Sequence, residues 1–210
     1  MACGYSQIPG VDYTENFAPV INDVTYRIML VMQIMLNLDC ALMDVETAFL
    51  HGVLEEEVYM ECPKGLDHQE DEILKLNKTI YGLVQAARQF YKTWANVLQN
   101  LGFVQSDVDP CLFVKPGPIM LGTYVDDNYV LGNKDAMKEI EEGVKQQGMS
   151  VTVENSLDDY LSCNIIFSKD KKRAWIGQPH LIKKMEKKFR KLVEQLTDTK
   201  TAGTPNTQVI

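Results

Sequence analysis

Two adjacent aspartates, Asp126 and Asp127, stand between two short runs that are rich in apolar and β-branched residues. The runs cover residues 119–125 and 128–131, and Asp and Asn are good turn formers. The pattern therefore predicts a β-hairpin with both aspartates at its tip. Like charges this close are unfavourable unless a cation neutralises them. Taken alone, the hairpin is either a solvated turn or part of a metal site.

A metal site that works on phosphates needs a third carboxylate from another strand, because two ions about 4 Å apart must activate one oxygen and steady another. Asp44 is the best candidate, since it lies at the end of a predicted strand over residues 41–45. The alternative for Asp44 is a surface or capping residue. A metal-dependent hydrolase with an acidic site stays open at this point, whereas an aspartic protease is disfavoured because no DTG or DSG triplet occurs.

The spacing of apolar residues in the rest of the chain predicts strands and helices that do not alternate strictly as βαβ units, which favours an α+β fold. Acidic residues flank Pro63 and Gly65, so a loop is expected across about residues 55–72. The predicted helices cover about residues 22–38, 85–101, 135–147 and 180–196, and the other predicted strands residues 111–114, 151–153, 164–167 and 174–176.

The apolar run of residues 28–36 is too short to span a bilayer, which needs about 20 apolar residues. It is expected to be a buried helix, and no membrane partner is expected. No signal peptide opens the chain, and the five cysteines never pair as CxxC. This spacing of the cysteines argues against a zinc site or a disulfide framework and favours a reducing, intracellular compartment.

Charge is distributed unevenly along the chain, whose net charge is -8. Residues 169–191 hold ten Lys or Arg and two acidic residues, so this strip carries +8 while the remainder carries -16. A basic strip on an acidic body is compatible with phosphate contact at one place. The alternative is a solvated face on a packed helix.

Two motifs and several shorter segments, in this order along the chain, resemble the reverse transcriptases of copia-type retrotransposons. The motifs are Met43-Asp44-Val45-Glu46-Thr47-Ala48-Phe49-Leu50-His51-Gly52 and Tyr124-Val125-Asp126-Asp127. The shorter segments are residues 4–7, 12–13, 17–20, 55–60, 76–83 and 109–113. The resemblance runs from about Gly4 to Pro205, and so covers nearly the whole chain.

The resemblance implies an RNA-directed DNA polymerase with a right-hand fold and an antiparallel palm sheet. It implies fingers at about residues 1–40 and 53–90, a palm at about 41–52 and 91–167, and a transition to the thumb at about 168–198. It also implies two Mg²⁺ ions, with Mn²⁺ as a substitute. The expected partners are a primed RNA or DNA template and dNTPs, together with the integrase and ribonuclease H of a Gag-Pol polyprotein. The expected location is a cytoplasmic virus-like particle or the nucleus.

Residue roles are carried over position by position from the family. Asp44, Asp126 and Asp127 match its metal-binding aspartates, and Val45 matches the backbone position beside one metal. Phe49 matches the aromatic residue under the sugar of the incoming nucleotide. Residues expected to contact the nucleotide or the primer and template are Tyr81, Gly82, Tyr124, Val125, Lys183, Lys187 and Arg190.

The sequence departs from the family pattern outside the three aspartates. Glu46 stands where Lys is common, Ser162 where Gly is usual, and Val84, Ala86 and Ala87 where Lys, Ser and Pro are common. The basic strand that usually precedes Gly4 is mostly missing, so an N-terminal truncation is expected. An impaired or inactive remnant that only binds nucleic acid is therefore the alternative to an active polymerase.

Overall fold

The computed structural model describes residues 2–67, 69, 71–157 and 159–198, with side chains up to residue 190 except that of residue 159. The chain forms two compact units, residues 1–157 and 158–210, and each is described by itself. Helices and antiparallel strands occur in both units, which confirms the predicted α+β class.

The centre of the first unit is a six-stranded antiparallel sheet with the order β4-β5-β6-β7-β1-β8. The strands predicted near residues 41, 111, 119, 128 and 151 are all present in it. Its strands are β1 (Asp39–Val45), β4 (Val104–Gln105), β5 (Leu112–Lys115), β6 (Ile119–Tyr124), β7 (Asp127–Gly132) and β8 (Val151–Glu154). Because β1 pairs with both β7 and β8, it lies inside the sheet although it comes first in the chain.

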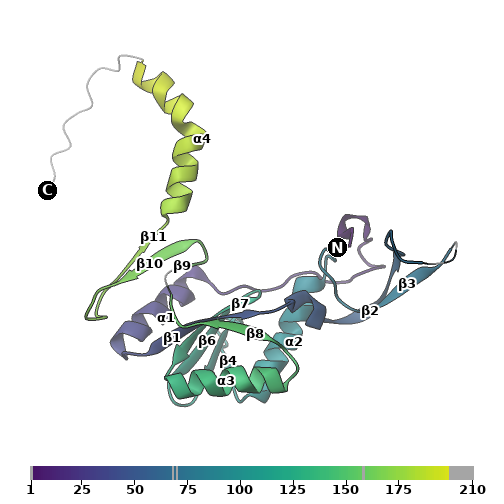
Figure 1. Cartoon of the computed structure of the whole chain (residues 1–210), viewed down its shortest axis with the longest axis horizontal. Helices are drawn as coiled ribbons and strands as arrows, with labels where there is room; N and C mark the ends of the chain where they lie inside the picture. Colours follow the sequence, from purple (N-terminus) through teal and green to yellow (C-terminus); the bar gives the residue numbers. More distant parts are fainter. Residues whose placement is uncertain (1, 68, 70, 158, 199–210) are drawn as a thin grey trace. The chain divides into compact units, whose positions relative to one another are not determined.

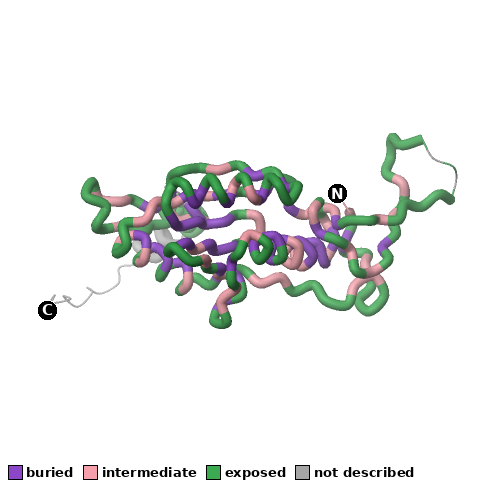
Figure 2. The backbone as a smooth tube through the Cα atoms, turned by 90° about the horizontal axis from the view of Figure 1, so that it is seen from below, coloured by how far each residue is buried: buried purple, intermediate pink, exposed green. Residues whose placement is uncertain are grey.

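Helices α2 (Ala86–Asn100) and α3 (Lys134–Gln146) cover one face of this sheet (Figure 1). Successive side chains of a strand point to opposite faces. In β1, Ala41, Met43 and Val45 enter the buried core with the two helices, so Leu42 and Asp44 point to the other face. Figure 2 shows the same division, with buried backbone in the sheet and on the inner sides of the helices.

Helix α1 (Asp23–Met35) packs against the opposite face of the sheet. Tyr26 meets Tyr129 of β7 edge to face at 5.9 Å, and the Tyr129 hydroxyl donates to Gln33 at 2.6 Å. The prediction of a buried helix is wrong for half of its surface, because Ile28 and Val31 are exposed. The sheet can cover only one side of a helix, whatever the polarity of the other side.

A two-stranded hairpin replaces the first part of the predicted loop. Its strands are β2 (Val53–Glu61) and β3 (Ile73–Lys78). Three consecutive glutamates are compatible with a strand here because their side chains alternate between exposed and partly buried positions. Glu57 also forms an ion pair with Lys75 of the neighbouring strand. Val58 is buried and anchors the hairpin. The predicted loop is wrong over β2 because cross-strand charge pairs stabilise acidic residues in a strand.

The second unit contains a three-stranded antiparallel sheet and one long helix. The elements are β9 (Asp159–Tyr160), β10 (Cys163–Phe167), β11 (Ala174–Gly177) and α4 (Pro179–Asp198), and the sheet order is β11-β10-β9. The strands predicted near residues 164 and 174 and the predicted C-terminal helix are confirmed. Among the described residues, no helix combines the length and apolarity that crossing a membrane would require.

Candidate active site

Asp44 and Asp127 are direct partners in the pairing of β1 with β7. Opposite residues of an antiparallel pair point to the same face, with Cβ atoms about 5 Å apart. The neighbouring residues Met43 and Val45 are buried against α2 and α3, so both carboxylates point to the face that these helices leave free. The Val45 amide donates to the carbonyl oxygen of Asp126 at 3.2 Å. The hairpin of β6 and β7 therefore lies beside the strand that ends at Asp44, in one antiparallel sheet.

The hairpin turn is shifted by one residue from the prediction. Tyr124 pairs with Asp127, so Val125 and Asp126 form the two-residue turn and Asp127 is already part of β7. Val125 has φ 57°, a left-handed conformation that is unusual for a β-branched residue. Such strain persists where surrounding contacts hold the backbone, and it concentrates at functional sites.

The acidic groups at this edge of the sheet disfavour each other's charged forms. Burial raises the pKa of Asp44, and the charges of Asp126 and Glu46 raise it further. Burial also raises the pKa of Asp127, with the charges of Asp126 and Asp44 as further causes. A cation placed between these carboxylates would relieve the repulsion.

The donor set fits Mg²⁺, which prefers oxygen ligands and is usually held by one or two carboxylates plus substrate phosphates and water. Within the described part of the chain, no three acidic, His or Cys side chains are grouped so as to hold a metal ion on their own.

Phe49 lies shortly after Asp44 in a short 3-10 helix, η2 (Ala48–His51). Its ring is 4.8 Å from that of Tyr81 and 6.4 Å from that of Phe90. The buried Thr79 hydroxyl donates to the Phe49 carbonyl oxygen, which fixes the backbone of η2 to the segment that carries Tyr81. Two residues that the sequence assigned to nucleotide contact are thus brought together from positions 32 residues apart.

Two glycines allow this close approach. A Cβ atom at Gly52 would lie 2.4 Å from the Thr79 hydroxyl oxygen, so no larger residue fits there. Gly82 has φ 100°, and a Cβ atom on it would lie 2.2 Å from the carbonyl oxygen of Ala2. The Ala2 amide also donates to the Tyr81 carbonyl oxygen at 2.7 Å, so the N-terminal segment supports the Tyr81-Gly82 turn.

The predicted primer and template contacts lie in two places. Tyr124 and Val125 flank the carboxylates at the end of the hairpin, and Tyr124 is exposed. Lys183, Lys187 and Arg190 lie on α4 in the second unit, and their spacing of four and three residues places them on one side of that helix. They carry a positive charge that is exposed to solvent, and Arg190 forms an ion pair with Glu186 at 3.4 Å.

Sequence reasoning missed Asn128, which is fully buried directly after the two aspartates. The signal that could have identified it is the polarity of one residue in a strand that is otherwise apolar beyond Asp127.

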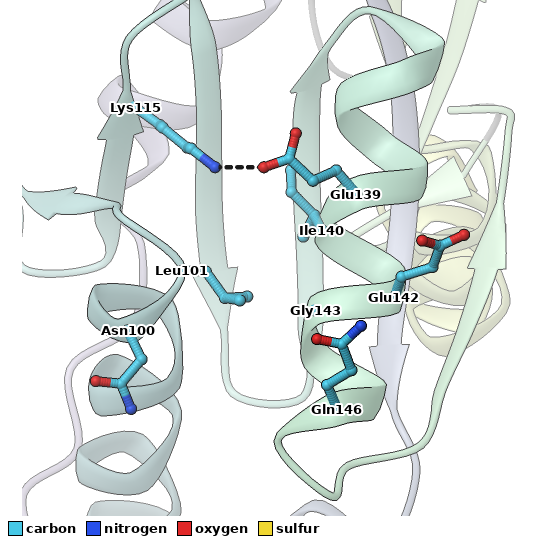
Figure 3. A pocket seen from close by; sticks show the side chains of 8 residues that line it. All are labelled: Asn100, Leu101, Lys115, Glu139, Ile140, Glu142, Gly143 and Gln146. Carbon is cyan, nitrogen blue, oxygen red and sulfur yellow. Dashed lines mark hydrogen bonds and ion pairs between the residues drawn. The ribbon is translucent and has the colours of Figure 1, made fainter.

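A hollow of about 320 Å³ lies between α2, β5 and α3 (Figure 3). It lies on the helix-covered side, and Lys115 spans it to Glu139 at 2.9 Å, so it is separate from the carboxylates.

Comparison with known proteins identifies the family of the chain. A family model described as reverse transcriptase (RNA-dependent DNA polymerase) matches residues 1–208. The Retrovirus-related Pol polyprotein from transposon TNT 1-94 of Nicotiana tabacum is 30% identical over 95% of the chain and 16% of its own length. That from transposon RE2 of Arabidopsis thaliana is 37% identical over 77% of the chain and 11% of its own length. The chain therefore spans less than a fifth of these polyproteins.

Proposed function

The chain belongs to the reverse transcriptase (RNA-dependent DNA polymerase) family of copia-type retrotransposons, and we propose that it extends a primer with dNTPs on an RNA template. The observation that carries the proposal is the pairing of Asp44 with Asp127 beside the Asp126 turn. This pairing sets two aspartates that are more than 80 residues apart in the chain opposite each other, next to the turn that contains Asp126, and so supports the assignment of all three to metal binding.

In the proposed reaction, the primer 3′-hydroxyl attacks the α-phosphorus of the dNTP and pyrophosphate leaves. Two bound divalent ions would lower the pKa of the attacking hydroxyl and stabilise the charge on the phosphates. Asp44, Asp126 and Asp127 would hold these ions, and the Val45 backbone would line the same site. The pKa values of Asp44 and Asp127 are raised first by burial and then by the charges of neighbouring carboxylates, and the second cause supports this role because a bound cation would relieve it.

Substrate selection is assigned to the aromatic cluster next to the carboxylates. We assign sugar discrimination to Phe49, whose ring is half-buried and held from behind by Phe90. A ring fixed in this way can exclude a 2′-hydroxyl by contact alone. Tyr81 and Gly82 would line the nucleotide side of the same surface, and Tyr81 is 39% exposed although its ring contacts that of Phe49.

The right-hand arrangement completes the proposal. The six-stranded sheet with α2 and α3 supports the palm, at about residues 41–52 and 91–167. The β2–β3 hairpin and its surroundings support the fingers, at about 1–40 and 53–90. The second unit would contain the transition to the thumb, at about 168–198, where Lys183, Lys187 and Arg190 would contact duplex phosphates. Integrase and ribonuclease H of a Pol polyprotein would act with it inside the cell, in a virus-like particle or in the nucleus.

The test is extension of a DNA primer on an RNA template in the presence of Mg²⁺, with Mn²⁺ as a second metal. We expect template-directed products from the chain and none from the Asp126→Asn variant, which keeps the shape of the turn. Exposed Asp107 gives a matched control, because Asp107→Asn removes the same charge elsewhere. Equal extension by wild type and Asp126→Asn would refute the assignment.

A second candidate is a catalytically inactive domain that still binds nucleic acid. One observation favours it, because Glu46 adds negative charge beside Asp44 at the edge where a triphosphate would approach. Salt-dependent binding of a primed template without any extension in Mg²⁺ or Mn²⁺ would support this candidate. Extension that improves in Glu46→Lys would instead show that the site is active and that Glu46 weakens it.

A further inference from the structure

We propose that Asn128 is a positioning residue for the catalytic hairpin, and that its side-chain amide locks the carboxylate-bearing turn to strand β1. The inference rests on the proposed function, because positioning matters only if Asp44, Asp126 and Asp127 carry out chemistry. Asn128 touches neither substrate nor metal in this scheme, since it points into the core on the opposite face of the sheet.

The donor side of the amide connects the two strands that carry the aspartates. Asn128 Nδ2 donates to the Met43 carbonyl oxygen at 3.0 Å and to the Asp126 carbonyl oxygen at 2.8 Å. The first acceptor belongs to the residue directly before Asp44, and the second belongs to the turn itself. A single side chain therefore holds the backbone at both ends of the carboxylate set.

The acceptor side of the amide ties the hairpin to helix α2. Asn128 Oδ1 accepts from Trp94 Nε1 at 2.8 Å and from the Thr123 hydroxyl at 2.9 Å. Trp94 and Asn128 are both fully buried, and the Trp94 ring stacks on Phe90 with an interplanar angle of 14°. All the hydrogen-bonding capacity of the amide is used. A fully satisfied buried network of this kind rigidifies what it connects.

The turn needs such a support because its conformation is unfavourable by itself. Val125 has φ 57°, and a strained residue keeps that value only where its neighbours over-determine it. Two bonds converge on the Asp126 carbonyl oxygen, one from Val45 N at 3.2 Å and one from Asn128. An apolar residue of similar size would fill the volume at position 128 but remove the bonds from Nδ2 to the Met43 and Asp126 carbonyl oxygens. The Asp126 carbonyl oxygen would keep only its bond from Val45 N, and the indole N–H only its bond to the Thr123 hydroxyl at 3.2 Å. The turn would then relax and carry the Asp126 carboxylate with it.

The experiment compares three variants of the whole chain. Asn128→Leu removes the amide, Trp94→Phe removes one donor to Oδ1 but keeps both Nδ2 bonds, and Val144→Ala weakens the same core from α3. The first readout is hydrogen exchange at the Val45 amide relative to that at Phe113, which measures the link between β1 and the turn. The second is the single-turnover rate of nucleotide addition per folded molecule, with the dNTP concentration dependence measured alongside.

For Asn128→Leu we expect Val45 exchange at least about tenfold faster and a rate about 100-fold lower, as small misplacements of reacting groups cause. The dNTP dependence should change much less than the rate. Trp94→Phe and Val144→Ala should lower the melting temperature and keep the rate within about threefold of wild type. Wild-type exchange and rate in Asn128→Leu would overturn the proposal. Equal rate losses in all three variants would also overturn it, because they would indicate general destabilisation.

If Asn128→Leu does not fold, Asn128→Asp replaces it. That variant keeps the shape and the acceptor for Trp94 but sets an oxygen against the two carbonyl oxygens, so the same two losses are expected. Wild-type behaviour of Asn128→Asp would overturn the proposal. If the wild-type chain does not extend a primer, the proposed function fails first. The Val45 exchange comparison then still decides whether Asn128 holds the turn.

Discussion

Replacing Asp126 by Asn should make the metal-free protein more stable while it abolishes synthesis. Burial and the Asp126 charge both raise the pKa of Asp44 and of Asp127. These ionised groups therefore destabilise the fold at neutral pH. Removing the Asp126 charge eliminates one repulsive interaction with each neighbour, and asparagine still fits a turn.

The magnitude follows from the positions of the groups on adjoining strand ends. At about 6 Å in water, two unit charges repel by about 0.7 kcal/mol, so two such pairs give about 1.4 kcal/mol. All three groups are at least partly exposed, and screening over a Debye length of about 8 Å roughly halves this value to about 0.7 kcal/mol. For a chain of this size the melting temperature should rise by about 2 °C.

The pH dependence carries a sign that can be checked. A carboxyl with a raised folded-state pKa contributes stability that is present at acid pH and lost as the pH rises through that pKa. The loss of stability with rising pH is smaller in Asp126→Asn, because one repulsive charge is missing. The two proteins should therefore melt together at a pH low enough to protonate Asp44 and Asp127, and diverge towards about pH 7.

Thermal unfolding across this pH range is the assay, with Asp107→Asn as the control for removal of an exposed charge. Mg²⁺ should raise the melting temperature of wild type more than that of Asp126→Asn, because binding to the folded state adds stability. A lower melting temperature for the variant at neutral pH would refute the electrostatic reasoning. A melting-temperature difference between the two proteins that does not change with pH would also refute the electrostatic reasoning.

Phe49→Val should admit ribonucleotides, measured as the ratio of dNTP to rNTP incorporation, and an unchanged ratio in an active sample would contradict the sugar-gate assignment. Changing Lys183, Lys187 and Arg190 together to Gln should flatten the plot of log affinity against log salt by about 2.7 on a duplex template, since each phosphate contact contributes about 0.9. An unchanged slope would show that these side chains do not contact phosphates. Gly82→Ala should lower stability by about 1–3 kcal/mol in chemical denaturation, because φ 100° strains any L side chain. An unchanged free energy of unfolding would contradict the strain assigned to the backbone at Gly82.

Local patterns determined much of this protein in advance. The sequence predicts helices α2, α3 and α4 and the strands around the aspartates, because each depends on the spacing of apolar residues within some fifteen positions. The strand ending at Asp44 was predictable for the same reason. The candidate carboxylates followed from residue chemistry and from the family resemblance.

Only the tertiary structure decided which of these elements meet. The β2–β3 ladder depends on pairing between segments that an intervening loop separates, and the glutamates of β2 predicted a loop by themselves. The register that sets Asp44 against Asp127 joins residues more than 80 positions apart, and that same register turns Asn128 inward. A one-residue shift of register would reverse every side chain of the strand, and local sequence does not contain that information. Burial of both sheet faces selects the register, and burial exists only once the whole chain is packed.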